Sequence, residues 1–411
     1  MKNRITIILF LVPITVLFAQ TATGDIENYI GTIIDNAPGS AGDNYVEPNS
    51  TQLNTWNTVI DFLLADNLSG ARSSVTTLNY QITEFTDTSI SPNQVFYVLE
   101  EKPPQSNYWG TYVFSKTPTR NNLIIQSPHS KFDTNTGKQA VYCFKNTGAK
   151  VVLINGTHRC NSDSFSPCSG TTSVCGSNDS YRVSDLAHTT NSMFQETTEN
   201  LLNTISNSVF IQLHGFAKNA TDPYVIMSNG TRETPATDYA TLIKDALLVE
   251  DNTLTFELAH INTSWTRLIG FTNTQGRLIN NSSDHCNTSA TTTSGRFIHI
   301  EQERSKLRDD QSDWIKMSNA LTSVFSSTLS TEDFSLANTI SISPNPTLGR
   351  VFINGKGIDQ IEVYNLYGQR ISTKIDSNDL SFIDLSDWAK GAYFLKIKTN
   401  KRTTTKKVIR L

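Results

Sequence analysis

Apolar runs of strand length alternate with helical patterns along most of this chain, and this alternation restricts its fold more than any other feature. After two helices between positions 56 and 78, strands are predicted at 94–99, 110–114, 123–126, 149–154, 209–213, 253–257 and 296–301. Further helices are predicted at 137–147, 184–205, 238–248 and 312–326. Such alternation favours an α/β fold, with a mixed, mostly parallel sheet flanked by helices.

Two of the predicted strands are each followed by a histidine. The run Leu123-Ile124-Ile125 leads into Ser127-Pro128-His129-Ser130-Lys131-Phe132-Asp133, and the strand at 209–213 leads into His214-Gly215. Ligands of such sheets bind at the carboxyl ends of the strands, so His129, Asp133 and His214 are expected to meet there. Two imidazoles and one carboxylate can hold zinc and leave a position open for water. Zinc is therefore the predicted cofactor, because it acidifies water and polarises a carbonyl group.

A third strand is expected to supply the general base. In Phe297-Ile298-His299-Ile300-Glu301, alternate side chains face the same side, so Phe297, His299 and Glu301 share a face. We predict Glu301 as the base, with Glu303 as the second candidate, and His299 contributes if this face lines the cleft. The competing interpretation makes 301–308 the charged start of a surface helix.

Four more residues are candidates for the site. Arg159 follows the strand at 149–154, and Arg277 lies in a polar loop; either could bind a substrate carboxylate through two parallel hydrogen bonds. The alternative for each is a surface salt bridge. Asp185 and His188 would share one face of the helix at 184–205. One of them could orient a zinc ligand, although Asp185 could equally cap the helix.

Four of the five cysteines lie in polar loops. Cys160, Cys168, Cys175 and Cys286 could form two disulfides in an oxidising compartment, with three alternative pairings. Cys143 falls in the helix at 137–147 and is expected to pack as a small apolar residue. A cysteine metal site is the competing idea, but the sequence contains no C-x-x-C motif.

The first 19 residues are predicted to be a signal peptide. Lys2 and Arg4 precede an apolar run over 5–18, and cleavage is expected at Ala19 or Gln20. The alternative is a membrane anchor, but a span needs about 20 apolar residues. No later segment could span a bilayer as a helix, so the mature protein is expected to be soluble and exported.

The 411 residues allow two or three domains. Residues 20–330 are predicted to form the α/β domain, 331–338 a linker, and 339–411 a small all-β sandwich. The net charge is −4, yet residues 339–411 carry twelve Lys and Arg against six Asp and Glu. Because this basic segment lacks interleaved arginines and aromatic residues, we do not expect nucleic-acid binding.

The last segment resembles a known family. Pro344-Asn345-Pro346-Thr347-Leu348-Gly349, Val363-Tyr364-Asn365-Leu366-Tyr367-Gly368 and Lys390-Gly391-Ala392-Tyr393-Phe394-Leu395 resemble the C-terminal sorting domain of type IX secretion. The resemblance implies interaction with the type IX machinery and export through the periplasm and outer membrane, to the cell surface or outside. The alternative is a carbohydrate-binding β-sandwich.

The three strand-end motifs carry a second resemblance. His129-Ser130-Lys131-Phe132-Asp133, Leu213-His214-Gly215 and Ile300-Glu301 resemble the zinc carboxypeptidase-like superfamily, near N-formylglutamate amidohydrolases and phage poly-γ-glutamate hydrolases. The resemblance implies zinc ligation by His129, Asp133 and His214, with Glu301 as the base. This chain departs from the family in two ways: the acid is Asp at the fourth position after His129, and a cysteine-bearing insertion follows.

The predicted function is an exported zinc hydrolase that cleaves an amide or peptide bond in a small peptide, N-acyl or glutamyl substrate. Neither a phosphate-binding loop nor a Gly-x-Ser-x-Gly motif is present, which disfavours a serine hydrolase. The alternative is a non-catalytic secreted surface protein that binds peptide or glycan on the same fold.

Overall fold

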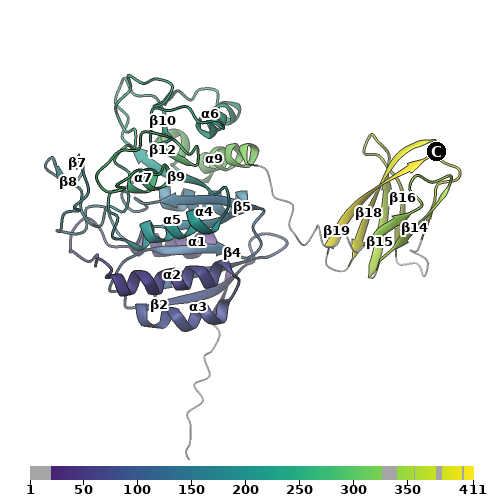
Figure 1. Ribbon diagram of the computed structural model, residues 1–411, viewed down its shortest axis with the longest axis horizontal. Coiled ribbons are helices and arrows are strands. Elements are labelled where there is room, and N and C mark those ends of the chain that lie inside the picture. The colour runs from purple at the N-terminus through teal and green to yellow at the C-terminus, as the bar shows by residue number, and fades with distance from the viewer. Residues whose placement is uncertain (1–19, 326–339, 356, 376–381, 400–401) are drawn as a thin grey trace, which may run out of the picture. The chain divides into compact units, whose positions relative to one another are not determined.

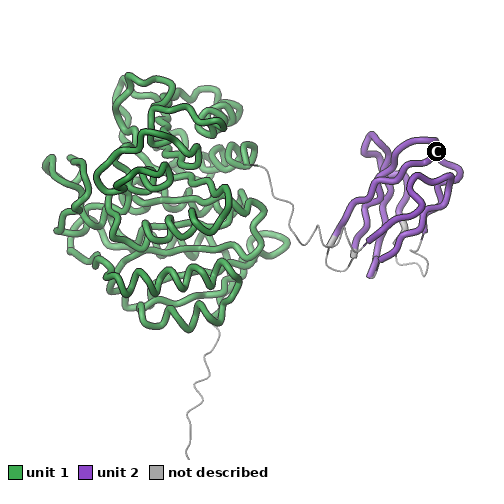
Figure 2. The backbone as a smooth tube through the Cα atoms, viewed as in Figure 1, with its two compact units in different colours: residues 1–326 green, residues 327–411 purple. Residues whose placement is uncertain are grey.

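The chain divides into two compact units, Met1–Ser326 and Ser327–Leu411, in a computed structural model (Figure 2). The structure describes residues 20–325, 340–355, 357–375, 382–399 and 402–411. The predicted signal peptide at 1–19 and the predicted linker at 331–338 lie outside these residues. Within the described ranges, no helix is long and apolar enough to cross a membrane.

Unit 1 alternates helices and strands (Figure 1). Its first half comprises β1 (Thr21–Gly24), α1 (Ile26–Asn36), α2 (Ser50–Leu64), α3 (Leu68–Val75), η1 (Thr76–Leu78), β2 (Tyr80–Asp87), β3 (Gln94–Glu101), β4 (Thr111–Ser115), β5 (Arg120–Ser127), α4 (Thr136–Thr147) and β6 (Ala149–Ile154). Its second half comprises β7 (Thr171–Thr172), β8 (Asp179–Ser180), α5 (Met193–Thr204), β9 (Val209–Phe216), β10 (Val225–Ser228), α6 (Tyr239–Glu250), β11 (Phe256–Leu258), α7 (Thr274–Ile279), β12 (Phe297–Glu303), α8 (Arg304–Leu307) and α9 (Gln311–Val324).

One large sheet organises unit 1. Its strand order is β1-β2-β3-β4-β6-β5-β9-β12-β10-β11. The four strands β6, β5, β9 and β12 run parallel to one another in the centre, whereas β2, β3 and β4 pair antiparallel on one side. The fold is therefore α/β with a mixed, mostly parallel sheet flanked by helices, as the alternating pattern predicted.

Helices cover both faces of this sheet because the central strands are apolar on both sides. In β5, Leu123 and Ile125 pack in a core with α1, α4, α6 and α9, while Ile124 packs in a second core with α2, α3, α5 and α7. All three side chains are fully buried. Burial of one such side chain contributes about 1.5–3 kcal/mol, so both layers hold the strand ends in place.

The pairing of β9 with β12 aligns two sets of polar side chains. In this parallel pair, Gln212 lies opposite His299 and His214 lies opposite Glu301. Side chains two apart along a strand face the same side. Phe210 lies two residues before Gln212 on β9, and Phe297 lies two residues before His299 on β12. Both phenylalanines belong to the core with α2 and α5, so the four polar side chains also face that side of the sheet.

The predicted helix at 184–205 is wrong in its first half. Helix α5 starts only at Met193, where the side chain of Ser192 caps it by accepting a hydrogen bond from the Gln195 amide. Residues 181–192 instead form consecutive turns, in which the amide of Asp185 donates to the carbonyl of Arg182. Asp185 is therefore not a helix cap.

Unit 2 is an all-β module. Its strands are β13 (Ser341–Ser343), β14 (Arg350–Asn354), β15 (Ile358–Tyr364), β16 (Arg370–Ile375), β17 (Phe382–Asp384), β18 (Gly391–Thr399) and β19 (Arg402–Arg410). They form two antiparallel sheets, ordered β13-β14-β17 and β16-β15-β18-β19. Alternate apolar side chains from both sheets, including Val351, Ile361 and Leu395, make the core.

Two disulfides tie the long loop between β6 and α5. Cys160 pairs with Cys175, and Cys168 pairs with Cys286. Cys143 is a free, fully buried thiol in α4. These pairings leave no loop cysteine available for a metal among the described residues.

Candidate metal centre

A tight turn after β5 brings His129 and Asp133 together. The amides of Phe132 and Asp133 both donate to the carbonyl of His129, so the chain folds back within five residues. This turn places Asp133 Oδ2 3.2 Å from His129 Nδ1. The spacing of four residues between His129 and Asp133 thus allows both side chains to bind one metal ion, although the sequence resemblance would place the acid at another spacing.

The third residue of the cluster comes from β9. His214 Nδ1 lies 3.1 Å from His129 Nδ1 and 3.6 Å from Asp133 Oδ2. The exposed fractions of His129, Asp133 and His214 are only 2%, 4% and 2%. The next residue, Gly215, donates its amide to Asp133 Oδ2. A Cβ there would lie 2.2 Å from the Arg308 guanidinium, so a larger residue would displace this packing.

The outer nitrogens of both histidines have acceptors, which determines the tautomer of each ring. His129 Nε2 lies 2.9 Å from Asp185 Oδ1, and His214 Nε2 lies 2.7 Å from Gln212 Oε1. The Gln212 amide is itself oriented, because Asn273 donates to Oε1 while Nε2 donates to Gln126. In its neutral form each histidine therefore carries its proton on Nε2 and turns an unprotonated Nδ1 inward.

Three acceptor atoms consequently converge: Nδ1 of His129, Nδ1 of His214 and Oδ2 of Asp133. In the metal-free protein, burial opposes ionisation of Asp133, but the positive charge that His129 carries when protonated and its hydrogen bond to this carboxyl outweigh it and lower the pKa of Asp133. Burial also lowers the pKa of His214 to about 4, so this ring is neutral at neutral pH. Buried acceptor atoms this close together need a cation between them. Two imidazole nitrogens and one carboxylate oxygen match the protein atoms that bind zinc.

Asp185 connects this cluster to Arg159. Its Oδ1 faces both His129 Nε2 and His188 Nδ1, each at 2.9 Å. Its Oδ2 accepts from Nε of Arg159 at 2.8 Å and from Nη2. Burial disfavours the charged form, but Arg159 and the two histidines hold the pKa of Asp185 well below its usual range. Asp185 therefore contacts His129 from an irregular segment, and not from the predicted helix.

Glu301 lies on the other side of His214. Its carboxylate, His214 and His299 offer ligand atoms within 4.8 Å of one another, and Glu301 Oε1 lies 3.7 Å from His299 Nε2. Oε2 of Glu301 is buried and has no hydrogen-bond partner among the described residues. Burial, followed by the charge of Asp133, raises the pKa of Glu301 to about 8, a value suited to accepting a proton near neutral pH.

These groups open into a cavity of about 450 Å³. His129, Arg159, His214, His299 and Glu301 form part of its lining, together with residues 171–174, Tyr181, His188 and residues 266–272. A larger groove of about 780 Å³ lies elsewhere in unit 1 and has no histidine or cysteine in its lining. The chemistry of unit 1 therefore centres on the smaller cavity.

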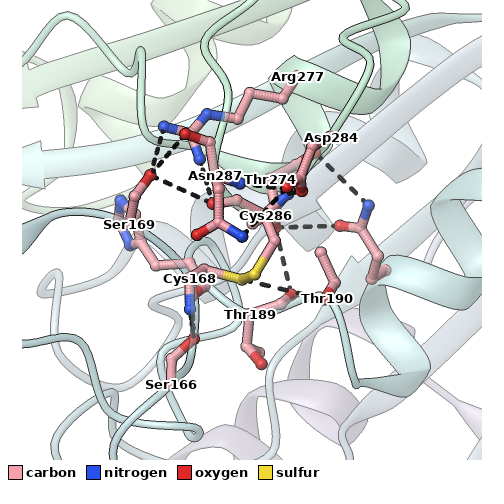
Figure 3. The surroundings of a disulfide bond; sticks show 12 residues. Ser166, Cys168, Ser169, Thr189, Thr190, Thr274, Arg277, Asp284, Cys286 and Asn287 are labelled. Carbon is pink, nitrogen blue, oxygen red and sulfur yellow. Dashed lines mark hydrogen bonds between the residues drawn. A yellow bond between two sulfur atoms is a disulfide. The ribbon is translucent and has the colours of Figure 1, made fainter.

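The structure does not bring two of the predicted residues to this cavity. Arg277 donates to the carbonyls of Phe271 and Cys286 and to Ser169 Oγ, so it ties loops together beside the Cys168–Cys286 disulfide (Figure 3). Glu303 caps α8 by accepting from the Ser305 amide. Sequence reasoning also missed Gln212, although its place two residues before His214 on one strand was a usable signal.

The C-terminal segment of the chain matches a known family of domains. Residues 341–410 match the secretion system C-terminal sorting domain. This match confirms the resemblance found in the sequence and indicates export by type IX secretion to the cell surface or outside. No curated protein matches the chain.

Solved structures similar to the chain include two with named functions. N-formylglutamate amidohydrolase from Ralstonia eutropha JMP134 has 11% identity and a TM-score of 0.31, with 53% of this chain and 96% of that chain covered. An aspartoacylase family protein from Mesorhizobium loti has 11% identity and a TM-score of 0.29, with 77% and 94% covered. At such scores these similarities support no inference about activity, which depends on the side chains of the site.

Proposed function

We propose that the protein is an exported zinc-dependent hydrolase that cleaves an amide or peptide bond. One observation carries the proposal: three buried atoms that can bind a metal, from His129, Asp133 and His214, converge within 3.6 Å of one another beside the buried carboxyl group of Glu301. When bound there, zinc acidifies a water molecule and polarises the carbonyl group of the substrate.

The side chains around the cluster have separate tasks in this proposal. Glu301 accepts the proton of the attacking water at Oε2 and returns it to the leaving amine. Arg159 Nη1, which lies 3.4 Å from His129 Nδ1, stabilises the negative charge that develops on the carbonyl oxygen. Asp185 holds His129 in the tautomer that leaves Nδ1 free, and Gln212 does the same for His214.

Metal analysis of the purified full chain tests the centre. We expect near-stoichiometric zinc in the wild type, and loss of zinc in His129→Ala and in His214→Ala. His285→Ala is the matched control, because His285 lies outside the cluster and should leave the zinc content unchanged. Absence of bound metal after zinc loading would refute the proposal.

Activity assays separate catalysis from mere binding. Zinc-loaded wild type should release amine from an N-acyl or peptide substrate, and Glu301→Gln should retain zinc but lose turnover. Removal of a positioned general base costs about 10²–10⁴-fold in rate. A zinc-loaded wild type without hydrolytic activity would instead support a secreted surface protein that binds ligands.

A further inference from the structure

We infer that this site accepts an uncharged amide, such as a peptide segment without a terminal carboxylate next to the scissile bond. The inference rests on the proposed hydrolase function and specifies its substrate class. It excludes substrates that carry a carboxylate, which Arg159 or Arg277 was predicted from the sequence to bind.

The charges around the cavity provide the first argument. Among the described residues that line it, Arg159 is the single Lys or Arg and Glu301 is the single carboxylate. Asp133 contacts His129 on its inward Nδ1 side, and Asp185 contacts it on the outer Nε2 side. Arg159, the single Lys or Arg of this lining, thus already faces the buried carboxylate of Asp185. No unpaired Lys or Arg is left among the described lining residues for a substrate carboxylate.

The bonding of Arg159 provides the second argument. Nε and Nη2 both donate to Asp185 Oδ2, so the fork that would grip a carboxylate in parallel is taken by a protein carboxylate. Nη1 is directed at the His129 ring, 3.4 Å from Nδ1. The N–H groups of Nη1 are therefore placed to serve an oxygen at the reacting centre, and not a carboxylate farther along the cavity.

Neighbouring arginines cannot replace Arg159. Arg277 bonds to carbonyls and Ser169, as described above. Arg308 donates to the carbonyls of Gln302 and Thr134, and Arg232 donates to the carbonyls of Ala259 and Trp265. None of these three lines the cavity.

The cavity walls are neutral, and one of them is covalently anchored. One wall is formed by the segment between Cys168 and Cys175, which contributes Thr171, Thr172 and Val174. The two disulfides attach this segment to Cys160 and Cys286. Residues 268–272 supply apolar and hydroxyl groups to the cavity as well. Such walls match an uncharged substrate. A substrate carboxylate would lose its bound water without gaining a hydrogen-bond partner, which weakens its binding about tenfold or more.

Calorimetry with a matched ligand pair tests the inference. N-acetyl-leucinamide and N-acetyl-leucine are titrated into zinc-loaded Glu301→Gln full chain, in which no turnover interferes. We expect the amide to bind about tenfold tighter. Equal or tighter binding of N-acetyl-leucine, or no binding of either ligand, overturns the inference.

A positive charge introduced on the cavity wall provides a second test of the inference. Val174 is 43% exposed and lines the cavity, so Val174→Arg should tighten N-acetyl-leucine up to about fivefold and leave the amide unchanged. Val249→Arg is the matched control, because Val249 is 83% exposed at the end of α6, away from the cavity. Direct binding of the N-acetyl-leucine carboxylate to zinc would affect both variants equally, so it cancels in the ratio of their dissociation constants.

The two proposals fail in different ways. If Val174→Arg and Val249→Arg affect N-acetyl-leucine equally, the neutral wall does not determine substrate choice and the inference is wrong. If zinc-loaded wild type cleaves neither ligand while Glu301→Gln still prefers the amide, the hydrolase proposal fails but the assignment of the ligand class holds.

Discussion

Glu301→Gln should remove a large pH-dependent contribution to the stability of the metal-free protein. Burial and the nearby Asp133 raise the pKa of Glu301 from 4.5 to about 8. One unit of pKa corresponds to about 1.4 kcal/mol, so ionising Glu301 in the folded, metal-free protein costs on the order of 4–5 kcal/mol.

The sign follows from the direction of the shift. Because the pKa is higher in the folded state, that state holds the proton more tightly than the unfolded chain does. The resulting stabilisation is fully present below pH 4.5, decreases as the pH rises, and is lost once the pH passes about 8. Glutamine cannot ionise, so Glu301→Gln should become more stable relative to the wild type by a few kcal/mol between about pH 5 and about pH 9.

Urea unfolding in the presence of EDTA, followed by tryptophan fluorescence, measures this difference. The full chain is used for both variants, so contributions from unit 2 cancel in the comparison. Glu47→Gln serves as the control, because Glu47 is an exposed glutamate of the same unit. A difference between wild type and Glu301→Gln that does not change with pH would show that burial does not hold this carboxyl neutral.

Three further predictions concern the metal centre and the stability of unit 1. Asp185→Asn should weaken zinc binding about 10–100-fold, measured by chelator competition, and unchanged affinity would contradict the orienting role of Asp185. Lys145→Met should lower the free energy of unfolding by about 3–5 kcal/mol in urea, because it removes the partner of one fully buried carboxylate and of two partly exposed ones; a loss below 1 kcal/mol would mean that water screens them. The double variant Cys168→Ser, Cys286→Ser should lose about 4–5 kcal/mol, since it opens a loop of 118 residues, and an unchanged melting temperature would argue against that estimate. The carboxylates paired with Lys145 belong to Asp25, Glu27 and Asp87.

Periodicity alone was sufficient for the fold class. The central strands are apolar on both faces, and this pattern depends only on neighbours in the sequence. It also placed His129 and His214 near the carboxyl ends of parallel strands, where β5 and β9 indeed bring them to 3.1 Å.

Local patterns were insufficient where a side chain bonds to a distant segment. Arg159 and Arg277 are equivalent candidates in the sequence, yet one meets Asp185 and the other meets loop carbonyls. The turns at 181–192 carry a helical pattern, but Ser192 starts the helix later, and Asp185 contacts His129, 56 positions away. Such partners depend on how loops cross the sheet edge, which no local periodicity encodes.

The sequence by itself determined the α/β architecture, the all-β sorting domain and three strand-end motifs, because secondary structure and family motifs are written in short-range patterns. Only the tertiary structure decided which atoms of those motifs face one another. It turned both Nδ1 atoms inward by placing Asp185 and Gln212 behind the rings. It also tied Arg159 to Asp185 and buried Glu301, because charge pairing and desolvation arise only when distant segments pack together.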